Sequence, residues 1–214
     1  MRIRFDEQLK QLNKEMINMG TMIEESIGDA VKALMKQDVE LAQKVMAGDE
    51  EIDRTERKIE DLCLRLLLQQ QPVARDLRNI SAALKMVTDM ERIGDHATDI
   101  SELAIVLSEK TYVKKLDHIE EMARETMLML IQSLEAYVEK DLDKAQKVIA
   151  HDDVIDDLFE EVKQELIELI RNHADEGEQA VDLLMVTKYF ERIGDHATNI
   201  AEWVIFSITG QIAG

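Results

Sequence analysis

The octapeptide ERIGDHAT stands at residues 91–98 and again, unchanged, at residues 191–198. Each copy carries a glutamate, an aspartate and a histidine, which are side chains that bind cations. A helix turns by about 100° per residue, so Glu91, Asp95 and Asp99 fall in one stripe along the first copy. Like charges at this spacing repel one another and weaken an isolated helix. The stripe therefore needs a cation, protons or arginines to offset the repulsion.

The second copy repeats this stripe with one substitution. Glu191 and Asp195 keep their acids, whereas Asn199 carries an amide at the place of Asp99. A neutral amide binds a hard cation less strongly than a carboxylate does. We therefore expect weaker binding at the second copy.

Two further pairs of acids precede the octapeptides. Asp49 and Asp53 lie in the segment KQDVELAQKVMAGDEEID, and Asp152 and Asp156 lie in the matching segment EKDLDKAQKVIAHDDVID. If each of these helices packs antiparallel to the helix of the following octapeptide, both lines of acids converge on one groove. Such oxygen-rich grooves suit Mg, Ca, Mn or Fe, and several ions can share bridging carboxylates.

An ordinary solvated helix face is the plain alternative, with surface ion pairs each worth under about 1 kcal/mol. Two features favour cation binding. Gly94 and Gly194 lie within helices, where each costs about 1 kcal/mol relative to alanine, so they predict the close approach of another backbone. The acids also match between the two halves, which solvated positions have no reason to do. His96 falls outside the stripe, and we expect it to make a capping or interhelical hydrogen bond.

The sequence favours a protein that is not an enzyme. Di-iron bundles use a Glu-x-x-His step, which the octapeptide lacks. The chain shows no glycine-rich phosphate loop, and its single cysteine, Cys63, has no evident partner base. A metal-storage or metallohydrolase bundle is the alternative that the clustered carboxylates motivate.

Composition predicts an all-α chain. Aromatic residues make up 4% of the 214 residues, and the chain has one proline and eight glycines, so the turn signals of a β fold are missing. The net charge of −19 disfavours nucleic acid and anionic lipid as partners and suits cations or a basic protein. We expect no membrane insertion, no signal peptide, a reducing cytoplasm, and Cys63 as a small core residue.

The repeats divide the chain into two halves, 1–108 and 109–214, each predicted as a bundle of three helices. Apolar residues recur at helical spacing. Asp38 is a suitable N-cap for the second helix, and Pro72 is expected to open the third. The prediction is two tandem three-helix bundles related by internal duplication, either as one elongated domain or as two. The helices are expected at about 5–37, 38–70, 72–108, 118–140, 142–172 and 178–209.

Two longer segments give the chain a family resemblance. LRNISAALKMVTDMERIGDHATDISE (77–102) and LLMVTKYFERIGDHATNIAEW (183–203) closely resemble the signature of the PhoU family, and the resemblance covers nearly the whole chain. It implies a PhoU-like fold and multinuclear metal clusters of Fe, Zn, Mg or Mn. The implied ligands are Asp49, Asp53, Glu91, Asp95 and Asp99 at the first site and Asp152, Asp156, Glu191, Asp195 and Asn199 at the second.

The resemblance also implies a role in phosphate homeostasis. PhoU proteins are cytoplasmic regulators that restrain high-affinity phosphate uptake and repress the phosphate-starvation response. They are thought to contact the ATP-binding subunit of the phosphate transporter and the sensor histidine kinase of the phosphate regulon, and several are homodimers. These properties are expectations for this chain.

Overall fold

The computed structural model describes residues 2–70 and 72–211, and this part of the chain contains helices and no strand. The all-α prediction is therefore confirmed. The six long helices and one short 3-10 turn are α1 (Arg2–Lys36), α2 (Val39–Gln70), α3 (Ala74–Leu107), α4 (Asp117–Glu139), α5 (Leu142–Asn172), η1 (Ala174–Glu176) and α6 (Gly177–Thr209).

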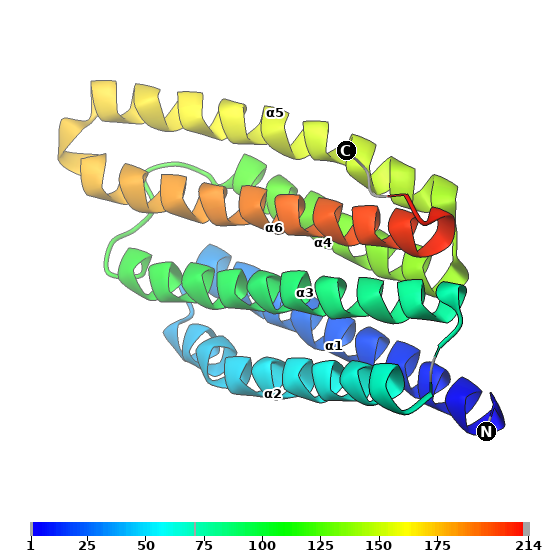
Figure 1. Cartoon of the computed structure of the whole chain (residues 1–214). Coiled ribbons are helices and arrows are strands. Elements are labelled where there is room, and N and C mark those ends of the chain that lie inside the picture. Colours follow the sequence, from blue (N-terminus) through cyan, green and yellow to red (C-terminus); the bar gives the residue numbers. More distant parts are fainter. Residues whose placement is uncertain (1, 71, 212–214) are drawn as a thin grey trace.

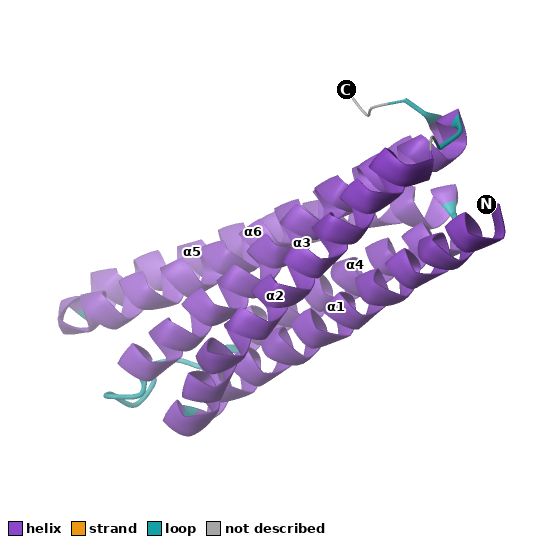
Figure 2. Ribbon diagram, turned by 60° about the horizontal axis from the view of Figure 1, so that its bottom comes forward, coloured by secondary structure: helices purple, strands orange, loops and turns teal. Residues whose placement is uncertain are grey.

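Each half of the chain forms an antiparallel three-helix bundle, and the two bundles lie side by side along their lengths (Figure 1). Helices α3 and α6 make the most extensive contact between any two helices of the described chain. A second, sparser contact joins α1 to α4. The ribbon in Figure 2 shows the six helices as one elongated bundle. One continuous hydrophobic cluster draws buried residues from all six helices, so the two halves share a single core.

The internal duplication extends to the geometry of the turns. Asp38 caps α2 by accepting a hydrogen bond from the Leu41 amide at 3.0 Å, as the sequence predicts, and Asp141 caps α5 through the Lys144 amide at the same distance. The residues just before these caps, Gln37 and Lys140, have left-handed φ angles of 54° and 57°. The equivalent turns thus close in the same way.

The start of α3 differs from the prediction. Pro72 does not open the helix, because Val73 is extended, with φ −68° and ψ 160°, and the helix begins at Ala74. The predicted place of Cys63 is confirmed, since its side chain is buried in the core and burial raises the pKa of the thiol to about 12. No helix in the described part of the chain has the length and apolar character needed to cross a lipid bilayer.

The aspartate caps allow a direct test of the duplicated turn. Replacing a capping aspartate by alanine removes the acceptor for an otherwise unpaired amide and costs about 1 kcal/mol. We expect Asp141→Ala to lower the free energy of unfolding by about that amount, whereas Asp141→Asn retains the cap and changes it little. Urea denaturation followed by circular dichroism measures both variants. Equal losses in the two variants would show that the side-chain oxygen does not cap α5.

Candidate metal centres

Two acidic clusters form where the second helix of each bundle packs on the third, and glycine permits the close approach. A Cβ atom at Gly94 would lie 3.2 Å from Cγ2 of Ile52 and 3.9 Å from Oδ1 of Asp49. At Gly194 it would lie 3.3 Å from Oδ1 of Asp152. The expected close neighbour is therefore present, but it is a pair of side chains and not another backbone. The two glycines let the aspartates of α2 and α5 lie against the octapeptide helices.

The first cluster joins carboxylates of α2 and α3. Asp49, Asp53 and Asp95 are half-buried, and each offers a carboxylate oxygen within 4.8 Å of those of the other two. Two arginines reach the cluster from solvent, with Arg57 3.3 Å from Asp53 and Arg92 3.0 Å from Asp95. Because both arginines are more than half exposed, these ion pairs offset little of the repulsion.

Burial and mutual repulsion both act on this cluster. Burial and the neighbouring charges of Asp95 and Asp53 raise the pKa of Asp49. The pKa of Glu91 is raised by burial and by the Asp95 charge, against the opposing effect of Arg92. Raised values for neighbouring acids mean that the folded chain holds more negative charge in this groove than its own residues stabilise.

Glu56 is a member of the first cluster that the sequence reasoning missed. Burial and the charge of Glu91 raise its pKa to about 6. Glu56 lies one helical turn beyond Asp53 on the same face of α2, and this spacing could have identified it. At the equivalent position α5 carries Phe159, so the two clusters differ here.

The second cluster joins α5 and α6. Burial and the charges of Asp195 and Asp156 raise the pKa of Asp152 to about 6, and burial and Glu191 raise the pKa of Asp195. Lys188 forms an ion pair with one oxygen of Glu191, while the other, Oε2, is buried and meets no hydrogen-bond partner in the described chain. A buried carboxylate oxygen without a partner is costly and fits a position that awaits a cation.

The last residue of the octapeptide also faces each cluster. The hydroxyl of Thr98 lies beside Asp49 and lowers its pKa, and Thr198 does the same to Asp152, in each case against the larger effect of burial. Both hydroxyl oxygens are buried, yet neither meets the geometry of an ordinary hydrogen bond within the described chain. The sequence reasoning overlooked these threonines, although they repeat with the acids.

The histidines and the last stripe positions lie toward the contact of α3 with α6. His96 Nδ1 is 3.0 Å from Asp99, and His196 Nδ1 is 2.8 Å from Asp89 of the other bundle. The capping or interhelical hydrogen bond expected of His96 is therefore wrong, because its partner Asp99 lies one turn along the same helix; His196 makes the interhelical bond instead. The Asn199 amide also donates to Asp89, at 3.1 Å.

These contacts separate the two last ligands that the sequence predicts. Asp99 remains near enough to the first cluster for its charge to raise the pKa of Asp49. Asn199 instead directs its amide nitrogen across the contact to Asp89. The structure thus brings Asp49, Asp53 and Asp95 together, with Glu91 and Asp99 near enough for their charges to act on the group, although Asp99 also pairs with His96. It groups Asp152, Asp156, Glu191 and Asp195 through their charges, without Asn199.

The donor set fits hard divalent cations. Both clusters offer carboxylate and hydroxyl oxygens from two helices. The first is half-buried, whereas in the second Asp152 and Glu191 are half-buried and Asp156 and Asp195 are exposed. A cation held there would neutralise the repulsion and tie α2 to α3 and α5 to α6. The residues that would hold it are those of the two clusters.

The fold and these sites define a duplicated helical-bundle protein with paired acidic clusters. The sequence profile of the PhoU domain matches residues 16–104 and 119–204, one match in each bundle. The chain belongs to the PhoU family.

Relatives from several bacteria support this assignment. The chain is 40% identical to the phosphate-specific transport system accessory protein PhoU homolog of Clostridium acetobutylicum, over 97% of this chain and 95% of that one. It is 37% identical to the homolog of Caulobacter vibrioides, over 97% and 90%. The crystal structure of PhoU from Pseudomonas aeruginosa superposes with a TM-score of 0.93 at 33% identity, covering 97% of this chain and all of that one.

The raised pKa of Asp152 predicts a pH dependence of stability in the metal-free chain. Its ordinary pKa of 3.8 rises to about 6 on folding, so its favourable contribution is present below pH 3.8 and is lost as the pH rises through about 6. We expect Asp152→Asn to match the parent chain near pH 4 and to be the more stable at pH 7. Thermal unfolding in a chelator across this range measures the difference.

Glu168→Gln is the matched control, because Glu168 is an exposed acid of α5, forms no ion pair within the described part of the chain and lies outside both clusters. Its stability difference from the parent is expected to stay constant over the same pH range. A constant difference for Asp152→Asn as well would contradict the repulsion inferred for the second cluster.

Proposed function

We propose that this chain is a cytoplasmic, non-catalytic regulator that restrains phosphate uptake and represses the phosphate-starvation response when phosphate is plentiful. The observation that carries the proposal is the doubled ERIGDHAT on α3 and α6, within a family match that spans both bundles. The relatives named as accessory proteins of a phosphate-specific transport system support the same role.

In this proposal the chain acts by binding partners. These are the ATP-binding subunit of the phosphate transporter and the sensor histidine kinase of the phosphate regulon, with a second copy of the chain as a homodimer partner. The chain's chemistry supports an adaptor more than a catalyst, since the thiol of Cys63 is buried with a pKa of about 12 and is therefore a poor nucleophile.

Divalent ions have a structural part in this function. Fe, Zn, Mg or Mn bound at the two clusters would hold the helices of each bundle together, as a single ion or as several ions that share carboxylates. We propose that the first site binds more strongly, because three of its carboxylates already converge and Asp99 adds to them. At the second site Lys188 forms an ion pair with Glu191, and the Asn199 amide donates a hydrogen bond to Asp89, so both side chains already have partners.

Metal content tests the two sites directly. We expect Asp95→Ala and Asp195→Ala each to lower the metal bound per chain, because each removes a carboxylate from one cluster. The change is measured by elemental analysis of purified protein that has been incubated with Mn, Fe, Zn or Mg at the same concentration and then dialysed. Asp61→Ala, an exposed acid of α2, is the control and is expected to bind as the parent does. If all three variants bind as much metal per chain as the parent, the acids form an ordinary solvated surface and not metal sites.

Deleting the gene tests the regulatory role. We expect phosphate uptake and starvation-gene expression to stay high in rich phosphate, and the parent gene to restore repression. Unchanged repression in the deletion strain would refute the proposal.

The metallohydrolase alternative, which the acidic clusters motivate, instead predicts turnover of a phosphoester by the purified metal-loaded protein. The metal-storage alternative predicts uptake and oxidation of Fe(II).

A further inference from the structure

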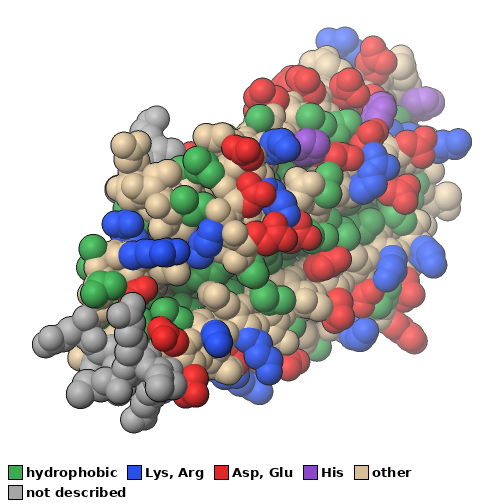
Figure 3. Space-filling model, turned by 90° about the vertical axis from the view of Figure 1, so that its right-hand side faces the viewer, with side chains coloured by type: hydrophobic (Ala, Val, Ile, Leu, Met, Phe, Trp, Pro, Cys, Tyr) green, Lys and Arg blue, Asp and Glu red, His purple; other side chains and the backbone are tan. Residues whose placement is uncertain are grey.

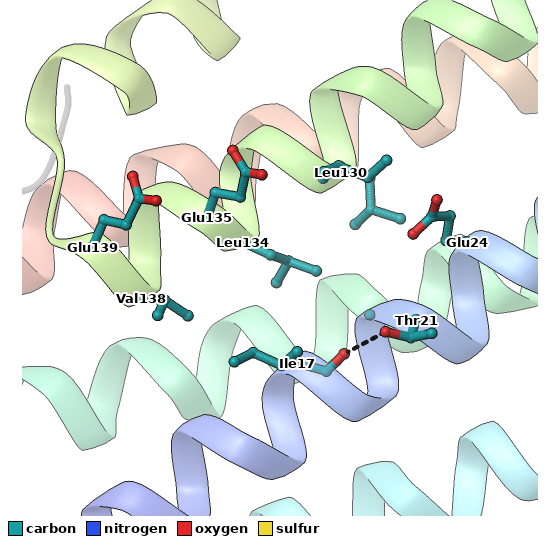
Figure 4. Close-up of a pocket in the computed structure, with 10 residues that line it drawn as sticks. Ile17, Thr21, Glu24, Leu130, Leu134, Glu135, Val138 and Glu139 are labelled. Carbon is teal, nitrogen blue, oxygen red and sulfur yellow. Dashed lines mark hydrogen bonds between the residues drawn. The ribbon is translucent and has the colours of Figure 1, made fainter.

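A groove runs between α1 and α4, away from the acidic clusters. It has a volume of about 230 Å³ and is open to solvent, and its apolar wall comes from Leu130 and Leu134 of α4 and from Ile17 of α1 (Figure 4). A Cβ atom at Gly20 would overlap the Leu134 side chain, so glycine lets α1 approach α4 at this point. Ile17 and Val138 are 46% and 40% exposed at the mouth of the groove. Apolar surface of this kind, concentrated in a hollow, is typical of a binding site.

The internal duplication supplies a comparison for this groove. The alignment that pairs the Asp38 cap with the Asp141 cap also pairs core residues along α1 and α4, such as Met19 with Met122 and Ile27 with Leu130, all of which are buried. The groove therefore has a counterpart at the other end of the same two helices, a hollow of about 440 Å³.

The two ends have diverged in chemistry. Ile17 of the first end corresponds to Glu120 of the second, and Thr21 corresponds to Arg124. At these two positions the second end carries exposed charges where the first end carries an apolar or neutral side chain, and at a third position the order is reversed, with Glu24 opposite Met127. The exposed Ile17 in place of Glu120 leaves apolar surface at the mouth of the first groove, as at a binding site for an apolar segment.

The edge of the apolar end is acidic. Glu24 of α1 and Glu135 and Glu139 of α4 line it, and Figure 4 shows the last two directed away from α1 at the outer edge. Lys144 binds both Glu135 and Glu139, at 2.9 and 2.8 Å, so one carboxylate charge remains there in addition to Glu24. None of the residues that line this hollow is basic, although Lys10 and Lys14 lie farther along α1.

We propose that this end of the α1–α4 groove is the docking site for an amphipathic helix of a partner protein, with an apolar face and a lysine- or arginine-rich edge. The apolar face would cover Ile17, Leu134 and Val138, and the basic edge would lie along Glu24 and Glu135. Helices bind grooves in this way through apolar residues spaced at one and two turns. Charge favours such a partner over a second copy of this chain, whose net charge is −19.

This proposal gives the adaptor of the proposed function a contact surface, and it is tested without any phosphate readout. The probe is a synthetic 16-residue helical peptide with leucines on one face and lysines flanking them. A second peptide carries glutamates in place of the lysines. Titration into isotope-labelled protein, followed by amide chemical shifts, reports both affinity and site. We expect the basic peptide to shift the amides around Ile17, Gly20 and Leu134, and the acidic peptide to bind at least about tenfold more weakly.

Ile17→Glu distinguishes groove binding from general attraction to an acidic protein. The substitution gives the first end the residue of its counterpart and adds negative charge. General attraction predicts unchanged or tighter binding, whereas docking in the groove predicts a loss of about tenfold. Val181→Glu, which places the same charge on an exposed valine of α6, is the matched control and is expected to bind as the parent does. Circular dichroism verifies that both variants fold.

Three results would overturn the proposal. They are no binding of the basic peptide, equal affinity in the parent and Ile17→Glu chains, and a parent dimer that Ile17→Glu converts to a monomer in light scattering. The last result would mean that a second copy covers the groove. Unaltered metal content in Ile17→Glu, together with lost peptide binding, separates this surface from the metal sites. If the deletion strain keeps normal repression while the peptide result holds, the proposed function fails and the groove does not.

Discussion

The contact between the second and third helix of each bundle is the constraint on which both metal sites depend. Gly94 and Gly194 leave no Cβ at the point of closest approach, so the side chains of Ile52 and Asp49, and of Ile155 and Asp152, lie against the octapeptide helices. This packing buries apolar residues and, by the same geometry, forces carboxylates into a half-buried groove. The favourable burial of the core thus stabilises an arrangement of acids that is unfavourable by itself.

That opposition explains how a cation would act on this fold. Without one, acids such as Asp49 and Asp152 have raised pKa values, which means that the groove favours protons or positive ions. An ion bound by acids of two helices would add its binding free energy to their packing. The octapeptide therefore combines a packing element, the glycine, with the carboxylates that this packing brings together.

The duplicated architecture also lets the two halves differ without loss of the fold. Turns and core positions repeat closely, as the caps of Asp38 and Asp141 show. Half-buried positions beside the clusters differ between the halves, since Glu56 of the first corresponds to Phe159 of the second. Charged side chains of both signs surround exposed apolar ones at the end of the bundle shown in Figure 3. Core positions are held in common by packing, whereas exposed positions are free to acquire separate binding roles.

The sequence by itself determined the helices, the duplication and most of the acids, because helical periodicity and repeats are local properties of the chain. Spacing placed Asp49 with Asp53 on one helix face and Glu91 with Asp95 on another, and the family resemblance joined the two pairs into one expected site. Only the tertiary structure decided how the halves combine, with α3 on α6 and one shared core. It also decided that Asn199 pairs with Asp89 of the other bundle, and that Thr98 and Glu56 face the first cluster. Such contacts between helices depend on rotation and approach in space, which the pattern along one helix does not specify.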